Sequence, residues 1–292
     1  MNGWLFHSYA WKVEERHERV LSIFIAYHTL LEAELDGALT HQLSRAASFD
    51  AVHIVGYSND IETVRDWLLR SDSVLISRLR SIVRHQDDAL RFFEFDQTLG
   101  IHIAKSLSGK SAPIGIIAVE RQLTLFEVFK GAGAEQVAPV GTHYVKTSES
   151  HSDRFLRVSN VLEHGANVRL VAFWLLPYFW NTSAQQVIVD TSGIYSVALT
   201  VVHEATSRGG LHHQPLVWSH RSHDGVDQIP PEDAAGAVFL VSASTSGGLV
   251  KRIAARGANL NRVITLPQQR CATERRNSLR PARFGWARDE AH

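Results

Sequence analysis

Two short loops of small and hydroxyl-bearing residues have the composition of an anion-binding site. The first loop comprises Asp190, Thr191, Ser192 and Gly193, and the second includes Ser242, Ser244, Thr245, Ser246, Gly247 and Gly248. Each loop follows an apolar run and precedes a helical pattern. Backbone N–H groups and the dipole at a helix N-terminus attract phosphate, and small residues let it come close. We therefore interpret both loops as candidate phosphate-binding segments; two ordinary strand-to-helix turns are the alternative.

Histidines gather around a third loop, in the stretch LHHQPLVWSHRSHDG. They are His212, His213, His220 and His223, and Arg221 lies among them. Histidines at such spacing can share a metal on a helix, but this stretch has a strand-then-loop pattern, and no carboxylate or cysteine completes a known ligand set. No metal site is therefore predicted. The functional interpretation is a cationic loop of His220, Arg221 and His223, with imidazoles charged only below about pH 6.5; surface histidines without a role are the alternative.

Other catalytic signatures are absent from the sequence. It contains no GxxxxGK[ST] phosphate loop, no GxSxG nucleophile turn and no GxGxxG dinucleotide motif. His203 and Glu204 begin an HExxH zinc motif, but Ser207 occupies the position of its second histidine. Cys271 is the single cysteine, which excludes a disulfide framework and suggests a reducing compartment.

The elements that must position these loops alternate along the C-terminal half. Strand-like runs occupy residues 168–173, 186–189, 216–218, 237–241 and 262–266, and helical patterns occupy 195–207 and 248–256. Strands that are apolar on both faces and alternate with helices predict a parallel α/β sheet with helices on both sides. Ligands of such sheets bind at the carboxyl ends of strands, where the two small-residue loops fall.

The N-terminal half has a different pattern. Apolar residues recur at three- and four-residue steps over residues 11–45, which predicts a long helix. Residues 52–57 predict a strand, 59–69 a helix, 73–106 further helical spacing and 113–119 another strand. The expected fold class is α/β, with a mainly helical region with short strands at 1–136, a parallel-sheet domain at 137–268 and a basic tail at 269–292.

Composition and charge narrow the classes of partner. The 292 residues contain 30 basic and 30 acidic side chains, so no net charge attracts nucleic acid or a membrane surface. From residue 270 onward, however, the sequence contains six arginines and only three acidic residues, together with the aromatic residues Phe284 and Trp286. Such a tail can bind nucleic acid through phosphate contacts and stacking; a merely exposed tail is the alternative. No apolar run reaches the ~20 residues of a membrane helix and no signal peptide is evident, so a cytoplasmic protein without a membrane partner is expected.

From about residue 140 to 268, the order of these landmarks resembles type I phosphoribosyltransferases, closest to the orotate branch. GTHYVKTSESHSDRFLRV is similar to the first hairpin of that branch, and VIVDTSGIYSVAL to its strand, pyrophosphate loop and helix. PLVWSHRSHDG is similar to its flexible loop, and AGAVFLVSASTSGGLVKRIAARGANLNRVITL to its phosphoribosyl-pyrophosphate (PRPP) loop with the following helix and strand. The resemblance implies a phosphoribosyl or nucleotide ligand, Mg²⁺ if that ligand is PRPP, and a homodimer.

The departures from the family pattern concern charge. Active members carry two adjacent acidic residues in the PRPP loop, where this sequence has Ser242, Ala243 and Ser244. The flexible loop keeps Arg221 as its one fixed cation, and Asp190 stands where a small residue is usual. Losing one electrostatic contact to a transition state costs on the order of 10²–10³ in rate. Because the resemblance implies a site that needs these charged residues, their absence predicts a degenerate active site.

Three functions follow from these observations. The first is a non-catalytic protein that binds a nucleotide or phosphoribosyl ligand and acts through a protein or nucleic-acid partner. Degenerate relatives in bacterial antiphage cassettes of the retron type set the expectation of a defence or regulatory role. The second is an atypical phosphoribosyltransferase or glycosidase-like enzyme. In that enzyme the missing carboxylate would come from one of four residues: Asp190, Asp153, Glu149 or Glu204. The third is an assembly subunit whose loops bind nothing.

Overall fold

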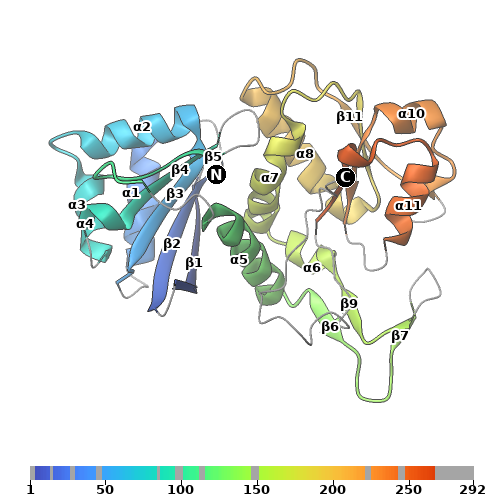
Figure 1. Cartoon of the computed structure of the whole chain (residues 1–292), viewed down its shortest axis with the longest axis horizontal. Helices are drawn as coiled ribbons and strands as arrows, with labels where there is room; N and C mark the ends of the chain where they lie inside the picture. The colour runs from blue at the N-terminus through green and yellow to red at the C-terminus, as the bar shows by residue number, and fades with distance from the viewer. Residues whose placement is uncertain are drawn as a thin grey trace. The chain divides into compact units, whose positions relative to one another are not determined.

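The computed structural model describes residues 4–13, 16–26, 30–43, 48–83, 86–95, 101–111, 116–145, 151–220, 225–242 and 247–266. The chain divides into two compact units, Met1–Thr124 and Leu125–His292 (Figure 1). The boundaries inferred from sequence, at 136/137 and 268/269, stay predictions, and the basic tail at 269–292 lies outside the described residues.

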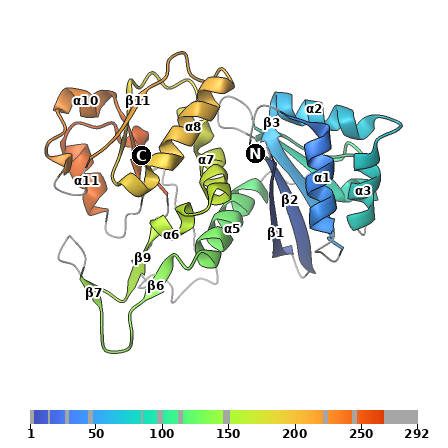
Figure 2. The ribbon, with the colours of Figure 1, turned by 180° about the vertical axis from the view of Figure 1, so that it is seen from behind.

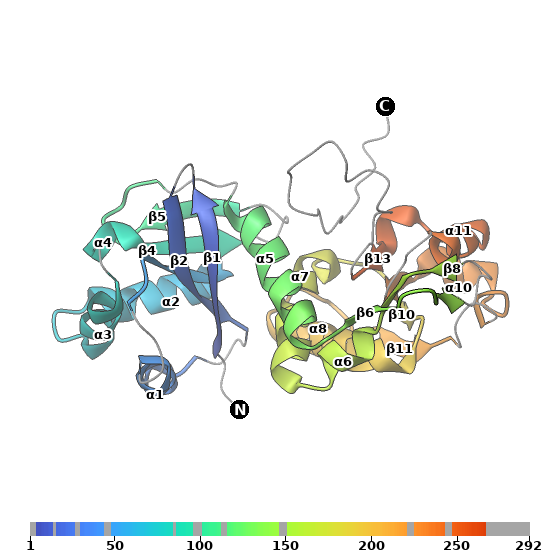
Figure 3. The same cartoon turned by 90° about the horizontal axis from the view of Figure 1, so that it is seen from below.

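The first unit is built on a five-stranded mixed sheet. Its strands follow the order β1 (Trp4–Val13), β2 (Arg16–Ile25), β3 (Ala51–Tyr57), β4 (Leu90–Phe95) and β5 (Ile101–Ser106). The outer pairs, β1 with β2 (side by side in Figure 3) and β4 with β5, are antiparallel, and β3 is parallel to both of its neighbours, β2 and β4. Parallel strands require crossover connections, and helices supply them here.

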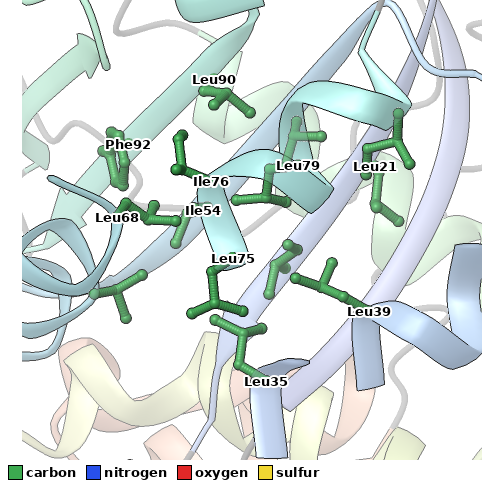
Figure 4. Packing of buried hydrophobic residues seen from close by; sticks show 14 of the residues in the cluster. Leu21, Leu35, Leu39, Ile54, Leu68, Leu75, Ile76, Leu79, Leu90 and Phe92 are labelled. Carbon is green, nitrogen blue, oxygen red and sulfur yellow. The ribbon is translucent and has the colours of Figure 1, made fainter. Parts of the chain in front are cut away.

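Three helices cover one face of this sheet. They are α1 (Glu32–Leu43), α2 (Ser58–Leu69) and α3 (Val74–Ile82), and Figure 2 shows them in front of the strands. Both parallel crossovers advance in the same direction across the sheet, so right-handed connections place their helices on the same face. Leu39, Leu68 and Leu79 from these helices pack against Ile54 and Phe92 of the strands (Figure 4). This cluster is the core of the first unit.

The expected helix over residues 11–45 is wrong. Residues Arg16–Ile25 form β2, and among the described residues of that range the helical ones are Glu32–Leu43. Leu21 and Ile23 face the helices, while Val20 and Phe24, which alternate with them, are also fully buried. A strand buried on both faces has a continuous apolar run, and periodicity cannot distinguish that run from a helix. The described part of the N-terminal region therefore contains a five-stranded sheet in addition to its helices.

The rest of the first unit confirms some expectations and corrects others. The strand at 52–57 and the helix at 59–69 are confirmed as β3 and α2. The helical spacing over 73–106 holds for α3 and for the short α4 (Gln86–Ala89), but β4 and β5 follow. The expected strand at 113–119 is wrong where it is described, because α5 (Ile116–Gly131) begins there. A short apolar run is compatible with either a strand or a helix. Only the length of the whole element distinguishes the two, and here the helix continues well beyond the run.

The second unit contains the parallel sheet that the sequence predicts. Its strand order is β11 (Leu216–Ser219), β10 (Gln186–Val189), β12 (Val238–Val241) and β13 (Val263–Thr265), all parallel. Helix α8 (Tyr195–Ser207) connects β10 to β11, α10 (Pro231–Gly236) precedes β12, and α11 (Gly248–Ala255) connects β12 to β13. The expected strands and the helices at 195–207 and 248–256 are confirmed within one or two residues, with one exception.

Helices lie on both faces of this sheet. From β10 the chain crosses to β11 on one side, and later from β12 to β13 on the other, so right-handed crossovers put α8 and α11 on opposite faces. Ile188 and Phe239 pack with Leu249 and Ile253 of α11. The alternating residues, such as Val187 and Leu240, are buried as well, which accounts for the apolar runs of these strands.

The exception is the strand expected at 168–173. These residues lie inside α7 (Gly165–Phe179), which follows the short α6 (Val158–Leu162). Val171, Ala172, Phe173, Trp174 and Leu175 are all buried, so no polar face marks the helical period. The seven residues from Leu170 to Leu176 are all buried, so this run packs in the interior.

A β-ribbon precedes α6. Strand β6 (Glu135–Val137) pairs with β9 (Arg154–Leu156), and β7 (Tyr144–Val145) pairs with β8 (His151–Ser152), both antiparallel. Residues 146–150, which include Glu149, lie outside the described residues. Within the described ranges, no helix has both the length and the apolar character that crossing a membrane requires.

Candidate functional site

The strand order brings the two small-residue loops side by side. β10 and β12 are adjacent and parallel, with Val189 opposite Leu240, so the loops that follow them leave from the same edge of the sheet. The chain turns to β11 on one side of β10 and to β13 on the far side of β12. Such a reversal sends the two following connections to opposite sides of the sheet, and ligands of parallel α/β sheets bind at strand ends of this kind.

Asp190 and Ser242 join the two loops directly. The backbone N–H of Ser242 donates to Oδ1 of Asp190 at 2.9 Å, and the Ser242 hydroxyl donates to Oδ2 at 2.7 Å. Asp190 is 4% exposed, and its own N–H donates to the carbonyl of Leu240 at 3.3 Å. Both oxygens of the carboxylate therefore hold the loop after β12 against the end of β10.

The third strand end contributes His220. Burial raises the pKa of the Asp190 carboxyl above its ordinary value, while the hydrogen bonds from Ser242 and the charge of His220 oppose that rise. His220 is 3% exposed, and its backbone N–H donates to the carbonyl of Val189 at 3.0 Å. A buried carboxylate, a hydroxyl and an imidazole thus come from the carboxyl ends of three adjacent strands.

Gly225 lies directly against His220. A Cβ on Gly225 would lie 3.2 Å from the Cβ of His220. Arg221 and His223 fall outside the described residues, and their predicted cationic role stays a prediction.

The histidines of the sequence pattern do not all gather in one place. Nε2 of His213 lies 2.9 Å from the carbonyl oxygen of Ala184, and these two residues precede β11 and β10 respectively. His213 therefore lies at the amino edge of the parallel sheet, and His220 lies at the carboxyl edge. Among the residues that the structure describes, no three His, Cys, Asp or Glu side chains are grouped as metal ligands.

The first loop exposes its small residues to solvent. Thr191, Ser192 and Gly193 are exposed, and a short 3₁₀ turn over Ser192–Ile194 leads into α8. The hydroxyl of Tyr195, the first residue of α8, donates to the carbonyl of Val217 at 2.8 Å. This bond fixes the start of α8 against β11, so the exposed hydroxyls lie on a well-anchored turn.

The second loop ends in a glycine whose conformation other residues rarely adopt. Gly247 has φ of +70° and ψ of 1°, the left-handed region, and α11 begins at the next residue. The carbonyl of Gly247 accepts the N–H of Lys251 at 3.0 Å, which completes the first turn. Ser244, Thr245 and Ser246 lie outside the described residues, and phosphate binding by them stays a prediction.

The other candidate carboxylates lie away from this edge. Glu204 is buried and forms an ion pair with Arg208 at 3.6 Å. It is nine residues beyond Tyr195, about 14 Å along α8 toward the amino edge of the sheet. The Asp153 side chain belongs to the β-ribbon and is 79% exposed. Of the candidates that the structure describes, Asp190 is the carboxylate at the strand ends.

Among known proteins, the similarity found for this chain is to solved structures. No protein-family model matches the sequence, and no curated protein matches it. Orotate phosphoribosyltransferase from Aeropyrum pernix is 14% identical, with 49% of this chain and 93% of that chain covered and a TM-score of 0.34. UMP synthase from Leishmania donovani is 9% identical, with a TM-score of 0.38. That match covers 80% of this chain and 53% of the other, so it spans about half the length of the Leishmania protein.

Proposed function

We propose that the C-terminal unit binds a nucleotide or phosphoribosyl ligand at the carboxyl ends of β10 and β12, and that it has lost ordinary phosphoribosyl transfer. One observation carries this proposal. The bonds between Asp190 and Ser242 join two loops of the predicted phosphate-binding type at the edge where the strand order reverses. Parallel α/β sheets bind their ligands at such reversals.

The loop after β12 supplies the features that favour a phosphate group. Gly247 adopts a left-handed conformation at the start of α11, and a helix N-terminus attracts phosphate through its N–H groups and dipole. Lys251 follows within the first turn of that helix and is exposed. The hydroxyls of Thr245 and Ser246, named by the sequence pattern, would add donors to the same phosphate.

Charge at the strand ends argues against catalysis of the ordinary kind. Transfer from PRPP develops positive charge on the ribose and negative charge on a departing pyrophosphate bound to magnesium, so it needs carboxylates at one end and cations at the other. Asp190 is the carboxylate at this edge among the described residues, and both of its oxygens already accept hydrogen bonds from Ser242. If PRPP is the ligand, Mg²⁺ arrives with its pyrophosphate as part of the ligand.

An atypical enzyme is the second candidate function. Its support is the buried carboxyl of Asp190, whose pKa is raised by burial and which lies close to His220, because perturbed acid and imidazole groups are typical of catalytic sites. Release of pyrophosphate from PRPP that depends on an added base would establish this candidate. Binding without any such release would favour the non-catalytic function.

Calorimetric titration of the full chain tests the main proposal. The ligands are the ribonucleoside 5′-monophosphates, PRPP with Mg²⁺ and pyrophosphate, titrated into the wild-type chain and into Thr245→Ala/Ser246→Ala. We expect binding by at least one of them and a loss of about tenfold or more in the double variant, since two hydrogen bonds to a charged group are removed. No heat of binding with any ligand at millimolar concentration would refute the proposal.

In the proposed function, the ligand-bound unit acts through a protein or nucleic-acid partner in a bacterial regulatory or retron-type antiphage system. The support is the resemblance to degenerate relatives and the arginine-rich tail at 269–292. If the tail binds RNA through phosphates, Arg275→Ala/Arg276→Ala lowers the salt dependence of RNA binding by about two counterions. An unchanged salt dependence would exclude these arginines from a nucleic-acid contact. A homodimer, expected by analogy, is tested by light scattering of the purified chain.

A further inference from the structure

We propose that the outer edge of β1 is a self-association surface, through which two copies of the chain join their first-unit sheets into one continuous antiparallel sheet. The observation behind this inference is the contrast between β1 and β5, the strands at the two margins of the five-stranded sheet. The inference concerns the first unit alone, so it is independent of the ligand site proposed for the second unit.

Strand β1 lies at one margin of the sheet. It pairs with β2 on one side, and among the residues that the structure describes no strand or bridge pairs with it on the other. Its ten residues make it nearly twice as long as the usual strand. The strand sequence WLFHSYAWKV contains no proline or glycine, and Lys12 is its one permanently charged residue. A long apolar edge of this kind presents N–H and C=O groups that another strand can pair.

The opposite margin has features that hinder such pairing. Strand β5 has six residues including Lys105, and its ladder with β4 is interrupted between Glu94 and Phe95. The chain also returns after β5, and Ser111 forms a bridge with Lys105. Short strands, irregular pairing, lysines and covering segments are the means by which proteins protect sheet edges. β5 combines these features, whereas β1 is long and pairs with β2 in unbroken register.

A second copy of the chain fits this edge by symmetry. A two-fold axis perpendicular to the sheet brings two β1 strands together antiparallel, and each face of one sheet continues as the same face of the other. About nine paired residues then form about nine hydrogen bonds between the chains, a number typical of stable interfaces. Lys12 lies near one end of β1, so the two lysines would be ~27 Å apart along the paired strands, too far for appreciable repulsion.

Ser8 lies near the centre of the proposed pairing. Trp4 and Phe6 pack on the face of the sheet that the helices cover, and Ser8, the next residue in that alternation, is exposed. Because the two-fold axis preserves faces, Ser8 lies opposite its counterpart in the second copy or diagonal to it, within about 8 Å. A charge introduced at this position therefore acts directly across the interface.

Sedimentation velocity of the full chain between about 1 and 100 µM, which brackets micromolar affinity, tests the inference. Ser8→Lys and Ser8→Glu each place like charges on both sides of the two-fold axis, and an equal mixture of the two variants places opposite charges there. Thr63→Lys adds the same charge at an exposed position on α2 and serves as the control. Urea unfolding of each variant verifies that it is folded.

We expect a dimer for the wild-type chain and for Thr63→Lys. Each Ser8 variant alone should dimerise at least about tenfold more weakly, and mixing the two should restore the dimer, because opposite charges then meet. A folding defect would not be repaired by mixing. A wild-type chain that is monomeric at the highest concentration, a dimer that both Ser8 variants leave unchanged, or a mixture that stays monomeric would each overturn the inference and leave the proposed function standing.

Discussion

Gly225 lies against His220 at the base of the loop that separates them. A Cβ built on Gly225 would stand 3.2 Å from both the carbonyl carbon and the Cβ of His220, closer than ordinary van der Waals contact. Gly225 is buried, and His220 is 3% exposed at the carboxyl end of β11. The absence of a side chain at position 225 is thus what allows Gly225 to lie this close to His220, whose charge acts on Asp190.

Gly225→Ala should therefore destabilise the second unit. Inserting a methyl group at a tight buried contact forces a backbone shift that costs about 1–3 kcal/mol in free energy of unfolding. Urea unfolding measures this cost, with Gly165→Ala as the control, because nothing lies within 4 Å of a Cβ at position 165 and the backbone there is not in the left-handed region. Equal stability of the two variants would mean that position 225 tolerates a side chain.

The raised pKa of Asp190 predicts a pH dependence of stability. Because burial favours the protonated carboxyl in the folded state, its contribution is fully present below the ordinary Asp pKa of about 3.9 and is lost as pH rises through the folded value. Relative to Asp190→Asn, which does not titrate, the wild-type chain should lose free energy of unfolding as the pH rises above about 4. Urea unfolding of both chains across this range checks the sign, and a difference that stays constant or grows would contradict it.

Asp88 should show the opposite sign. Hydrogen bonds from Lys110 and Ser108 lower the pKa of its carboxyl, so its contribution is present above the ordinary Asp pKa and disappears as pH falls through the lower, folded value. Asp88→Asn should thus be less stable than the wild-type chain at neutral pH and equal to it in strong acid. Because Asp88 is exposed, the effect is small, and added salt should reduce it further. A deficit that persists in acid would assign it to another cause.

Substitutions in the core of the first unit should change the free energy of unfolding by a larger amount. Leu79 is 0% exposed and packs with the strand residues Ile54 and Phe92 (Figure 4). Leu79→Ala should cost about 2–5 kcal/mol in free energy of unfolding through lost contacts and a residual cavity. Leu69→Ala on α2, where the side chain is 59% exposed, should change stability by about 0.5 kcal/mol or less. A similar loss of free energy of unfolding in both variants would show that Leu79 of α3 does not contribute to this core.

The sequence predicted the second unit better than the first, for a physical reason. The helix at 195–207 and the strand at 186–189 match the structure because glycine and polar residues separate short β-branched runs from helical patterns. In the first unit β2 is buried on both faces, as α7 is in the second, so neither has the polar side that periodicity needs. The helix expected at 11–45 and the strand expected at 168–173 failed for this shared reason.

The candidate site was predictable as two loops but not as one place. Small residues after apolar runs identified positions 190–193 and 242–248 without reference to each other. Their adjacency depends on β12 lying beside β10 rather than beside β11, a strand order that no local pattern encodes. The bonds from Ser242 to Asp190 follow from that order, as does the separation of His213 from His220. In the sequence, Asp190 is an acidic residue where the resembling family has a small one. The structure shows that its carboxylate accepts hydrogen bonds from Ser242.

Hydrogen exchange measured by mass spectrometry, with and without a ribonucleoside 5′-monophosphate at millimolar concentration, tests the central claim most directly. Bound phosphate should slow amide exchange in peptides that cover residues 242–255 and 188–197, which carry the two loops and the starts of α11 and α8. The same ligand should leave these peptides unchanged in Thr245→Ala/Ser246→Ala. Protection of both segments in the wild-type chain alone is the predicted result. Protection confined to other regions, or none in a chain that binds the ligand, would contradict a phosphate site at the carboxyl ends of β10 and β12.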